Sequence, residues 1–441
     1  MLLSAGSFSH TQALDGVDAF TFIKVPNPLS GKNPRYPLIP RAVPAPGESF
    51  EDLRFGTSLT RATGTPGLRH NYSRFDPFNA DGSRVLLIDP ATGLWRVYRT
   101  ASFPYNKPAN LVRTIDNLPE LWWDPKDADI IHGLRDFSIV ALNVASGREK
   151  IVKDFSRDTK IGSILKREPD LYRITDKDEG EPSLDRRYWV FALQGSRNDY
   201  RLRRLFTWDR VQNKVLGIYK LSAAEAEVID WVGMSPLGRW VVIGGGSGTV
   251  KTSGLTIVDK KFRTFHKLAW ETAHSDVSLD SAGREVVVMQ NTRTDYVDLI
   301  PIDTRSKTVM SVGDYRNNIV RRMVRLYYNS GSPIGLQSGV HISCNHSGYC
   351  VIGANIERGL PEQNWLDRSI ILVKLDSAKP RAFYLAKVYN TTGDYWEETQ
   401  ASMSNDGSKV AWADNWGRNV GRGKCFLMQL DMPPGWEKLL E

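Results

Sequence analysis

The sequence predicts an all-β fold, a seven-bladed β-propeller, from three observations. A short motif recurs seven times along the 441-residue chain. Each copy reads as a strand, a turn containing Gly, Asp or Asn, and a second apolar strand. A third strand, and often a fourth, follows most copies before the next one begins. Self-similarity at a period of about 40–50 residues is typical of propellers, whose blades are four-stranded sheets.

The first copy, HNYSRFDPFNADGSRVLLID, shows the pattern, because an NADG turn joins a polar strand to the apolar run VLLI. Segments such as GLWRVYRT and RRLFTWDR supply third strands, and REKIVKDF, NKVLGIYKL and RTFHKLAW supply fourth strands. The seven copies span residues 70–89, 119–134, 179–195, 230–246, 274–291, 340–355 and 399–417.

The last unit ends after CFLMQLD, so its outer strand is missing. We expect FGTSLTRAT, residues 55–63, to supply that strand and so to close the ring by pairing the two ends of the chain. This divides the chain into a Pro-rich arm over 1–54, a propeller over 55–432 and a tail over 433–441. The best helical candidate is the short stretch SAAEAEVIDW.

The composition describes a folded protein, because 41% hydrophobic and 10% aromatic residues can build a large core. No run of about 18 apolar residues is present, so a membrane protein is not expected. Cys344 and Cys350 flank a turn in CNHSGYC and are candidates for a disulfide, a bond that persists outside a reducing cytosol. We therefore expect a secreted or periplasmic monomer, although the N-terminus MLLSAGSFSH lacks the features of an export signal.

The formal net charge of +8 favours a polyanionic partner. The basic residues are scattered and form no nucleic-acid motif, so an acidic polysaccharide or oligosaccharide is expected rather than DNA or RNA. No GxSxG, P-loop or dinucleotide fingerprint occurs, so no nucleotide or organic cofactor is expected. The glycine-rich GGGSGT follows a second strand and is interpreted as a loop at the rim of a pocket.

In a propeller, the starts of the first strands and the ends of the second strands meet at one mouth of the central channel. The residues at these positions are strongly polar, and three of the seven histidines, His70, His274 and His341, fall on first-strand starts. This placement indicates a site. The alternative is that such histidines satisfy backbone groups or bind ordered water.

The polar residues at this mouth of the channel could support two kinds of chemistry. His274 with Asp276 on one blade and His341 on the next can converge on one divalent ion such as zinc, manganese or calcium. Glu398 or Gln400 from the seventh blade can serve as a further ligand. The alternative is a hydrogen-bonded network on the channel wall. His70 and Tyr72 lie two residues apart, hence on one face of a strand, where both can transfer protons.

Proton abstraction next to a carboxylate also needs a positive group, for which Arg135 is the candidate, with Arg293 and Arg325 as alternatives. The remaining polar residues of the ring and its loops are expected to bind substrate: Glu181, Asp230, Trp231, Gln290, Asn291, Arg293, Arg325, Asn355 and Asn415. Glu179, Glu181 and Asp230 leave a glycoside hydrolase open. A propeller that binds or scaffolds without chemistry is the other alternative.

The repeats, with HNYSRFDPFNADGSRVLLID in the first, HSD in the fifth, HIS in the sixth and QASMSNDGSKVAWADNWG in the seventh, resemble the propeller-type polysaccharide lyases. These include oligogalacturonate, ulvan and rhamnose-glucuronate lyases. The resemblance implies β-elimination at a uronic acid, with His and Tyr as base and acid, an Arg facing the carboxylate, and a metal. His70 matches the first-strand histidine of this pattern, and His274, Gln337 and His341 match in part the metal ligands of the oligogalacturonate lyases.

Overall fold

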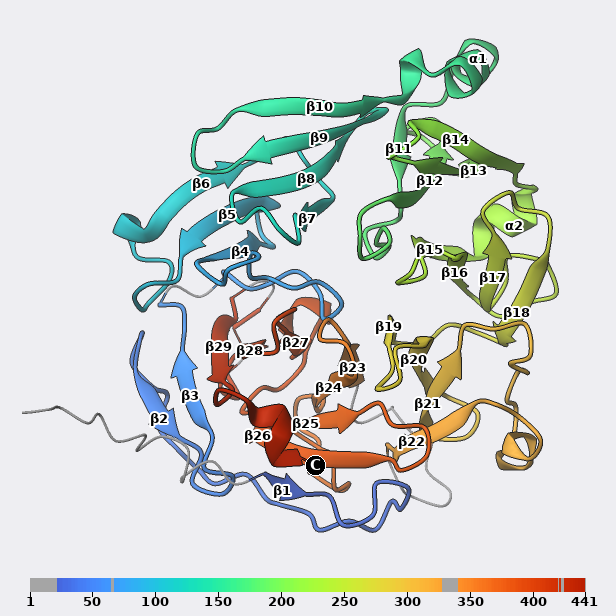
Figure 1. Cartoon of the computed structure of the whole chain (residues 1–441). Helices are drawn as coiled ribbons and strands as arrows, with labels where there is room; N and C mark the ends of the chain where they lie inside the picture. The colour runs from blue at the N-terminus through green and yellow to red at the C-terminus, as the bar shows by residue number, and fades with distance from the viewer. Residues whose placement is uncertain (1–21, 65–66, 327–339, 419, 422–423, 441) are drawn as a thin grey trace, which may run out of the picture.

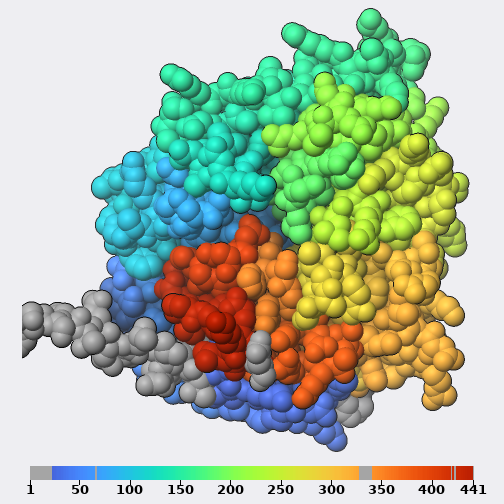
Figure 2. Space-filling model, in the orientation of Figure 1, coloured from blue at the N-terminus to red at the C-terminus, as the bar shows by residue number. Residues whose placement is uncertain are grey.

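The fold is a ring of seven antiparallel sheets, seen in a computed structural model that describes residues 22–64, 67–326, 340–418, 420–421 and 424–440 (Figure 1). The predicted seven-bladed propeller is therefore confirmed. The short turns that the sequence motif predicts join successive strands, so neighbouring strands pair antiparallel throughout the sheets. In the space-filling view the blades pack side by side, with a narrow recess where they meet at the centre (Figure 2).

Blades two to five each contain four strands in sequence order. Blade two holds β7 (Leu121–Trp123), β8 (Ile130–Arg135), β9 (Ser138–Asn143) and β10 (Glu149–Asp154). Blade three holds β11 (Arg173–Thr175), β12 (Tyr188–Gln194), β13 (Leu202–Asp209) and β14 (Lys214–Lys220). Blade four holds β15 (Ile229–Met234), β16 (Trp240–Gly245), β17 (Leu255–Asp259) and β18 (Phe265–Ala269). Blade five holds β19 (Ser275–Leu279), β20 (Glu285–Asn291), β21 (Tyr296–Pro301) and β22 (Arg321–Arg325).

The other three blades depart from this plan. Blade one is a three-stranded sheet of β4 (Arg84–Asp89), β5 (Leu94–Arg99) and β6 (Leu111–Ile115). Blade six holds β23 (Val340–Ser343), β24 (Tyr349–Ala354), β25 (Ser369–Lys374) and β26 (Arg381–Lys387), and blade seven holds β27 (Ser402–Met403), β28 (Lys409–Asp414) and β29 (Phe426–Asp431). The expectation of four strands in blade one is wrong, because only two isolated bridges, Arg69 to Ile88 and Phe78 to Val85, stand in place of its innermost strand.

The N-terminal region closes the ring, as predicted. β3 (Ser58–Arg61) pairs antiparallel with β29, so that Leu59 lies opposite Leu430 in the outer part of blade seven (Figure 1). Leu59 is 1% exposed and packs in the apolar cluster of blades six and seven. The pairing of β3 with β29 joins the two ends of the chain in one sheet.

The Pro-rich arm continues this pairing on the outside of the ring. β1 (Ile23–Lys24) adds a fifth strand to blade six beside β26, and β2 (Ser49–Glu51) adds a fifth strand to blade seven beside β3. Tyr36, between these strands, packs edge-on against Phe55 and Tyr384. The arm is thus bound to the propeller by backbone pairing and by aromatic packing.

Helices are few and short. The SAAEAEVIDW stretch forms α2 (Ala223–Val228), which Ser222 and Glu225 begin with a capping box. A helix that was not predicted, α1 (Thr159–Arg167), begins where the Asp158 carboxylate accepts hydrogen bonds from two backbone amides. No helix in the described part of the chain is long and apolar enough to cross a membrane.

Cys344 and Cys350 form the disulfide for which they were candidates. The bond joins the two ends of the turn between β23 and β24. Replacing both cysteines by serine is expected to lower the free energy of unfolding by about 2 kcal/mol, because the unfolded chain loses a short covalent loop. Denaturant titrations of the oxidised protein and the double variant measure this difference. An unchanged midpoint would contradict the expectation.

Candidate functional site

The first half of the first motif copy does not form the innermost strand of blade one. Between the bridges at Arg69 and Phe78, residues 70–77 leave the sheet of blade one and cross the centre of the ring. The crossing is shown by Arg74, whose guanidinium lies 3.4 Å from the Glu179 carboxylate and 3.6 Å from the Asp276 carboxylate. Its guanidinium carbon also lies 3.9 Å from the centre of the Trp231 ring. These partners belong to blades three, five and four, so this segment brings side chains of blade one to the opposite side of the channel.

Tyr72, on this segment, contacts two histidines. Its hydroxyl lies 3.2 Å from Nδ1 of His274, and its ring packs edge-on against His341 with 5.4 Å between the ring centres. The rings of His274 and His341 lie 4.3 Å apart. The structure therefore brings together one predicted proton-transfer group and two predicted metal ligands.

The protonation states of this pair follow from its surroundings. Burial, reinforced by Glu179, raises the pKa of Tyr72 well above its usual value, so its hydroxyl keeps the proton. Burial, together with the neighbouring His341, lowers the pKa of His274 to about 3, so its imidazole is neutral at neutral pH. In the neutral tautomer that carries its proton on Nε2, His274 accepts the hydrogen bond from the Tyr72 hydroxyl through the lone pair on Nδ1.

His341 is held by Glu398 of the blade-seven loop. The His341 Nε2 atom lies 2.7 Å from the Glu398 carboxylate, and His341 is 1% exposed. Burial alone would raise the pKa of Glu398, but the hydrogen bond from His341, the charges of His341 and His274 and the contact with Gln400 together bring the pKa below its usual value. Glu398 is therefore an anion that orients His341 beside the Tyr72 and His274 pair.

The Arg74 and Asp276 pair lies next to the Tyr72 and His274 pair, because Arg74 follows Tyr72 by two residues and Asp276 follows His274 by two. Asp276 also accepts hydrogen bonds from the backbone amides of Val277 and Cys344. Burial nevertheless raises its pKa to about 7. Arg74 is not among the site residues predicted from the sequence, although its spacing of two residues from Tyr72 was a usable signal.

His70 lies elsewhere. It is 0% exposed, and its Nε2 atom lies 2.5 Å from the backbone carbonyl of Gln400, to which it donates a hydrogen bond. Arg69 packs beside it and is hydrogen bonded to the His70 and Trp396 carbonyls and to the Gln400 side chain. His70 thus ties blade one to blade seven, and we assign it no proton transfer.

The buried His70 makes stability depend on pH. Burial, and then the charge of Arg69, lowers its pKa in the folded protein to about 3, below the 6.5 of a free histidine. The stability that neutral His70 contributes is present above pH 6.5 and is lost as the pH falls from 6.5 toward 3. His70→Gln keeps a hydrogen-bond donor without the titration, so the wild type should lose up to about 1.4 kcal/mol per pH unit relative to this variant. Urea titrations between pH 4 and 7 measure this difference, and parallel curves for the two proteins would contradict it.

Arg135 is engaged with its own blade. Both of its terminal nitrogens bind the carboxylate of Glu149 on the outer strand, at 2.8 and 2.7 Å. The side chain lines a cleft between blades two and three rather than contacting the Tyr72 and His274 pair. The structure therefore does not bring Arg135 together with Tyr72.

The four predicted metal ligands are not all placed. Gln337 lies outside the described residues. Among the residues that the structure describes, no group of three or more His, Cys, Asp or Glu side chains could hold a metal ion. His341 Nε2 is directed at Glu398 and His274 Nδ1 at Tyr72, so these side chains do not fit a metal as they stand.

Five of the residues expected to bind substrate lie near the channel or its rim, and a sixth, Arg325, lies on β22, the outermost strand of blade five. Gln290 donates its backbone amide to the His274 carbonyl and is partly exposed. Trp231 is buried beneath Arg74, whereas Arg325 is 3.4 Å from Asp295. The other three are Glu181, half-buried with a pKa raised by burial, and the exposed Asp230 and Arg293.

Three asparagines expected to bind substrate are instead buried within the protein. The Asn291 amide donates to Asp298, and the Asn355 amide donates to Thr392. Asn415 accepts from the backbone amide of Thr391. The polar ends of these second strands hold loops in place, which the sequence pattern could not distinguish from ligand contacts.

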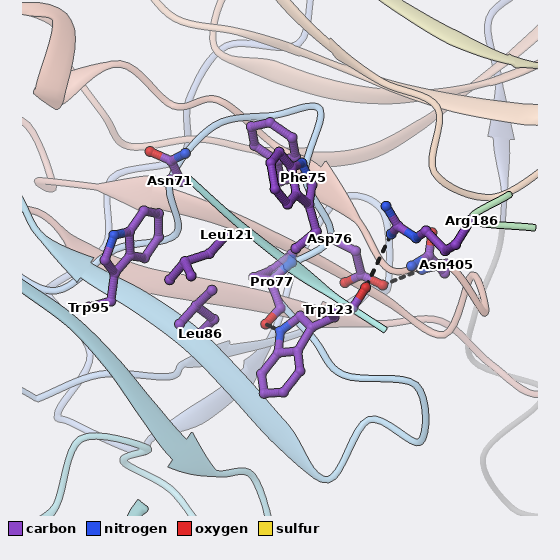
Figure 3. Close-up of a pocket in the computed structure, with 11 residues that line it drawn as sticks. Asn71, Phe75, Asp76, Pro77, Leu86, Trp95, Leu121, Trp123, Arg186 and Asn405 are labelled. Atoms are coloured by element: carbon purple, nitrogen blue, oxygen red, sulfur yellow. Dashed lines mark hydrogen bonds between the residues drawn. The ribbon is translucent and has the colours of Figure 1, made fainter. Parts of the chain in front are cut away.

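Near the same crossing segment, a small cavity of about 30 Å³ lies between blades one and two (Figure 3). Aromatic side chains, among them Phe75, Trp95 and Trp123, line it, and Asp76 and Arg186 lie at its polar end. Burial raises the pKa of Asp76 to about 8, although it accepts hydrogen bonds from two backbone amides. This cavity has room for about one or two water molecules.

Comparisons with known proteins bear on the fold. No family model matches the chain, and no curated protein sequence matches it. An oligogalacturonate lyase from Vibrio parahaemolyticus is similar in structure, with a TM-score of 0.56, 11% identity, and coverage of 89% of this chain and 98% of that one. An oligogalacturonate lyase in complex with manganese gives a TM-score of 0.56 at 12% identity, covering 89% and 97%. Hydrazine synthase of Kuenenia stuttgartiensis is less similar, with a TM-score of 0.46 at 13% identity and coverage of 83% and 96%.

The fold is a seven-bladed propeller similar to that of the oligogalacturonate lyases. The resemblance to propeller-type polysaccharide lyases is thus confirmed at the level of the fold.

Proposed function

We propose that this protein is a lyase that cleaves a uronic-acid-containing polysaccharide or oligosaccharide by β-elimination at the centre of the propeller. The observation that carries the proposal is the contact between the Tyr72 hydroxyl and His274 Nδ1. It places a protonated acid and a neutral base 3.2 Å apart, which is the pair that elimination needs. The similar lyase folds and the positive net charge support the same class of substrate.

The elimination uses both groups at once. When the sugar binds, the Tyr72 hydroxyl turns to the glycosidic oxygen at C4, and the lone pair on His274 Nδ1 becomes free. His274 removes the proton from C5, the electron pair forms the C4=C5 double bond, and the C4–O bond breaks. Tyr72 gives its proton to the leaving oxygen. The proton on His274 then passes to the Tyr72 oxygen across the original contact, which restores both groups.

The neighbouring charges assist this transfer. Arg74 lies close enough to Tyr72 to favour negative charge on its oxygen, which opposes the effect of burial. Glu398, through its hydrogen bond to His341, places a negative charge near His274 that favours the imidazolium. The effects of Arg74 and Glu398 grow as negative charge develops on the Tyr72 oxygen and positive charge on the His274 imidazole. They therefore stabilise the transition state more than the ground state.

The sequence predicts a bound divalent ion, and one similar structure is an oligogalacturonate lyase in complex with manganese. Because the described residues do not form a metal site, no step above passes through a metal. A bound divalent ion would supply positive charge for the substrate carboxylate. We also propose a secreted or periplasmic location, which the disulfide of the β23–β24 turn supports.

The test is the ultraviolet absorbance of the protein incubated with a panel of acidic polysaccharides, with and without a chelator. A rising signal from the conjugated C4=C5 double bond is the expected result, and the chelator arm shows whether a metal takes part. A flat trace with every polysaccharide, in both arms and after added manganese, would contradict the proposal.

A further inference from the structure

A cleft of about 390 Å³ lies between blades two and three, at the mouth of the channel where His274 is found. The register of the strands establishes this position. Arg173, at the start of β11, pairs with Gln194 at the end of β12, just as Ser275, next to His274, pairs with Met289 near the end of β20. Starts of innermost strands share one mouth, so the cleft opens on the same face as the proposed catalytic pair. Its size is that of a small-ligand site.

The walls of the cleft are held by one buried side chain. Gln194 is 3% exposed, and its amide oxygen accepts hydrogen bonds from the Tyr172 hydroxyl at 3.0 Å and from Arg173 Nε at 2.6 Å. Its amide nitrogen donates to the Tyr200 carbonyl at 2.6 Å. Two wall residues and the loop between β12 and β13 are thus fixed by Gln194 before any ligand binds.

The lining combines aromatic rings with positive charge. The guanidinium carbons of Arg173 and Arg197 lie 5.7 and 5.6 Å from the centre of the Tyr172 ring. Tyr200 lies edge-on to Tyr172 and is 57% exposed, so much of its ring is accessible to a ligand in the cleft.

One of these guanidinium groups is available for a ligand. Arg135 is paired with Glu149, and Arg173 lies 3.7 Å from Glu120. Arg197 is exposed, and no carboxylate among the described residues lies within ion-pair distance of it. A planar guanidinium prefers a carboxylate, which it can bind through two parallel hydrogen bonds.

We infer that this cleft is a subsite for an acidic sugar, in which Arg197 binds a uronate carboxylate and Tyr172 and Tyr200 contact the pyranose ring. The inference rests on the proposed function for the identity of the ligand, and it adds where the chain of the substrate lies. A polymer that extends from the catalytic pair over blades two and three would place a further uronate here. The subsite contributes to binding rather than to proton transfer.

The test measures binding by calorimetry, using the full chain with Tyr72→Phe so that turnover is slow on the time scale of the titration. The probe is an oligogalacturonate, and its fully methyl-esterified form is the neutral comparison. In this background, Arg197→Gln and Tyr200→Ala are compared with Arg157→Gln, which removes the same charge from an 88% exposed side chain on the rim of blade two. We expect about tenfold weaker binding of the acid in the two cleft variants, no change in Arg157→Gln, and weak binding of the ester.

Equal dissociation constants for Arg197→Gln and Arg157→Gln, equal binding of acid and ester, or no binding of the acid would overturn the subsite. Kinetics of the protein with an intact Tyr72 separate this result from the proposed function. Formation of unsaturated product with the same KM in Arg197→Gln would refute the subsite and keep the lyase. Acid-selective binding that depends on Arg197, without any unsaturated product, would keep the subsite and refute the lyase.

Discussion

Tyr72→Phe is expected to reduce turnover by about 10²- to 10⁴-fold, the usual contribution of a positioned acid or base. The variant removes the hydroxyl that protonates the leaving oxygen and that later takes the proton from His274. It keeps the ring that packs edge-on against His341, so the site should retain its shape. The initial rate of unsaturated product, at saturating substrate, measures the effect.

The matched control is Tyr98→Phe. Tyr98 is also buried, at 5% exposure, but it lies on β5 of blade one and outside the channel. This control should keep the wild-type rate. If Tyr72→Phe retained more than a tenth of the rate while it folded normally, the assignment of Tyr72 would be wrong.

The largest expected loss of stability from a single substitution concerns the closure of the ring. Leu59→Ala is expected to lower the free energy of unfolding by about 2–5 kcal/mol, because Leu59 is buried in β3 opposite Leu430 and its removal leaves a cavity. The loss falls at the pairing between β3 and β29, where the two ends of the chain meet. The denaturant midpoint, followed by tryptophan fluorescence, measures it.

Leu53→Ala is the control for this variant, because Leu53 lies six residues earlier and is 76% exposed. It should change the free energy of unfolding by less than about 0.5 kcal/mol. Equal midpoints for the two variants would contradict the stabilisation of the ring closure by Leu59.

The architecture could be predicted from the sequence because its signals are local. In the fourth copy, residues 230–246, the turn and the apolar run after it define a hairpin of β15 and β16 within twenty residues, and the same pattern recurs in blades two to seven. The closing strand followed from simple counting, since the last unit lacked an outer strand and residues 55–63 had strand character.

The site could be predicted only in part, because its geometry depends on the path of one segment. His70 and Tyr72 would share a face if residues 70–77 formed a strand. This segment instead crosses the channel, so His70 is directed at the Gln400 carbonyl and Tyr72 at His274. The ion pair between Arg135 and Glu149 could not be predicted either, because the two side chains come into contact only in the folded sheet of blade two.

The most direct measurement of the central claim counts two products of one reaction. The protein is incubated with an acidic polysaccharide, and the unsaturated ends, from ultraviolet absorbance, are compared with the new reducing ends over the same time course. Elimination by Tyr72 and His274 predicts one unsaturated end for each new reducing end, and the loss of both in Tyr72→Phe. New reducing ends without any unsaturated ends would show hydrolysis and would contradict the account.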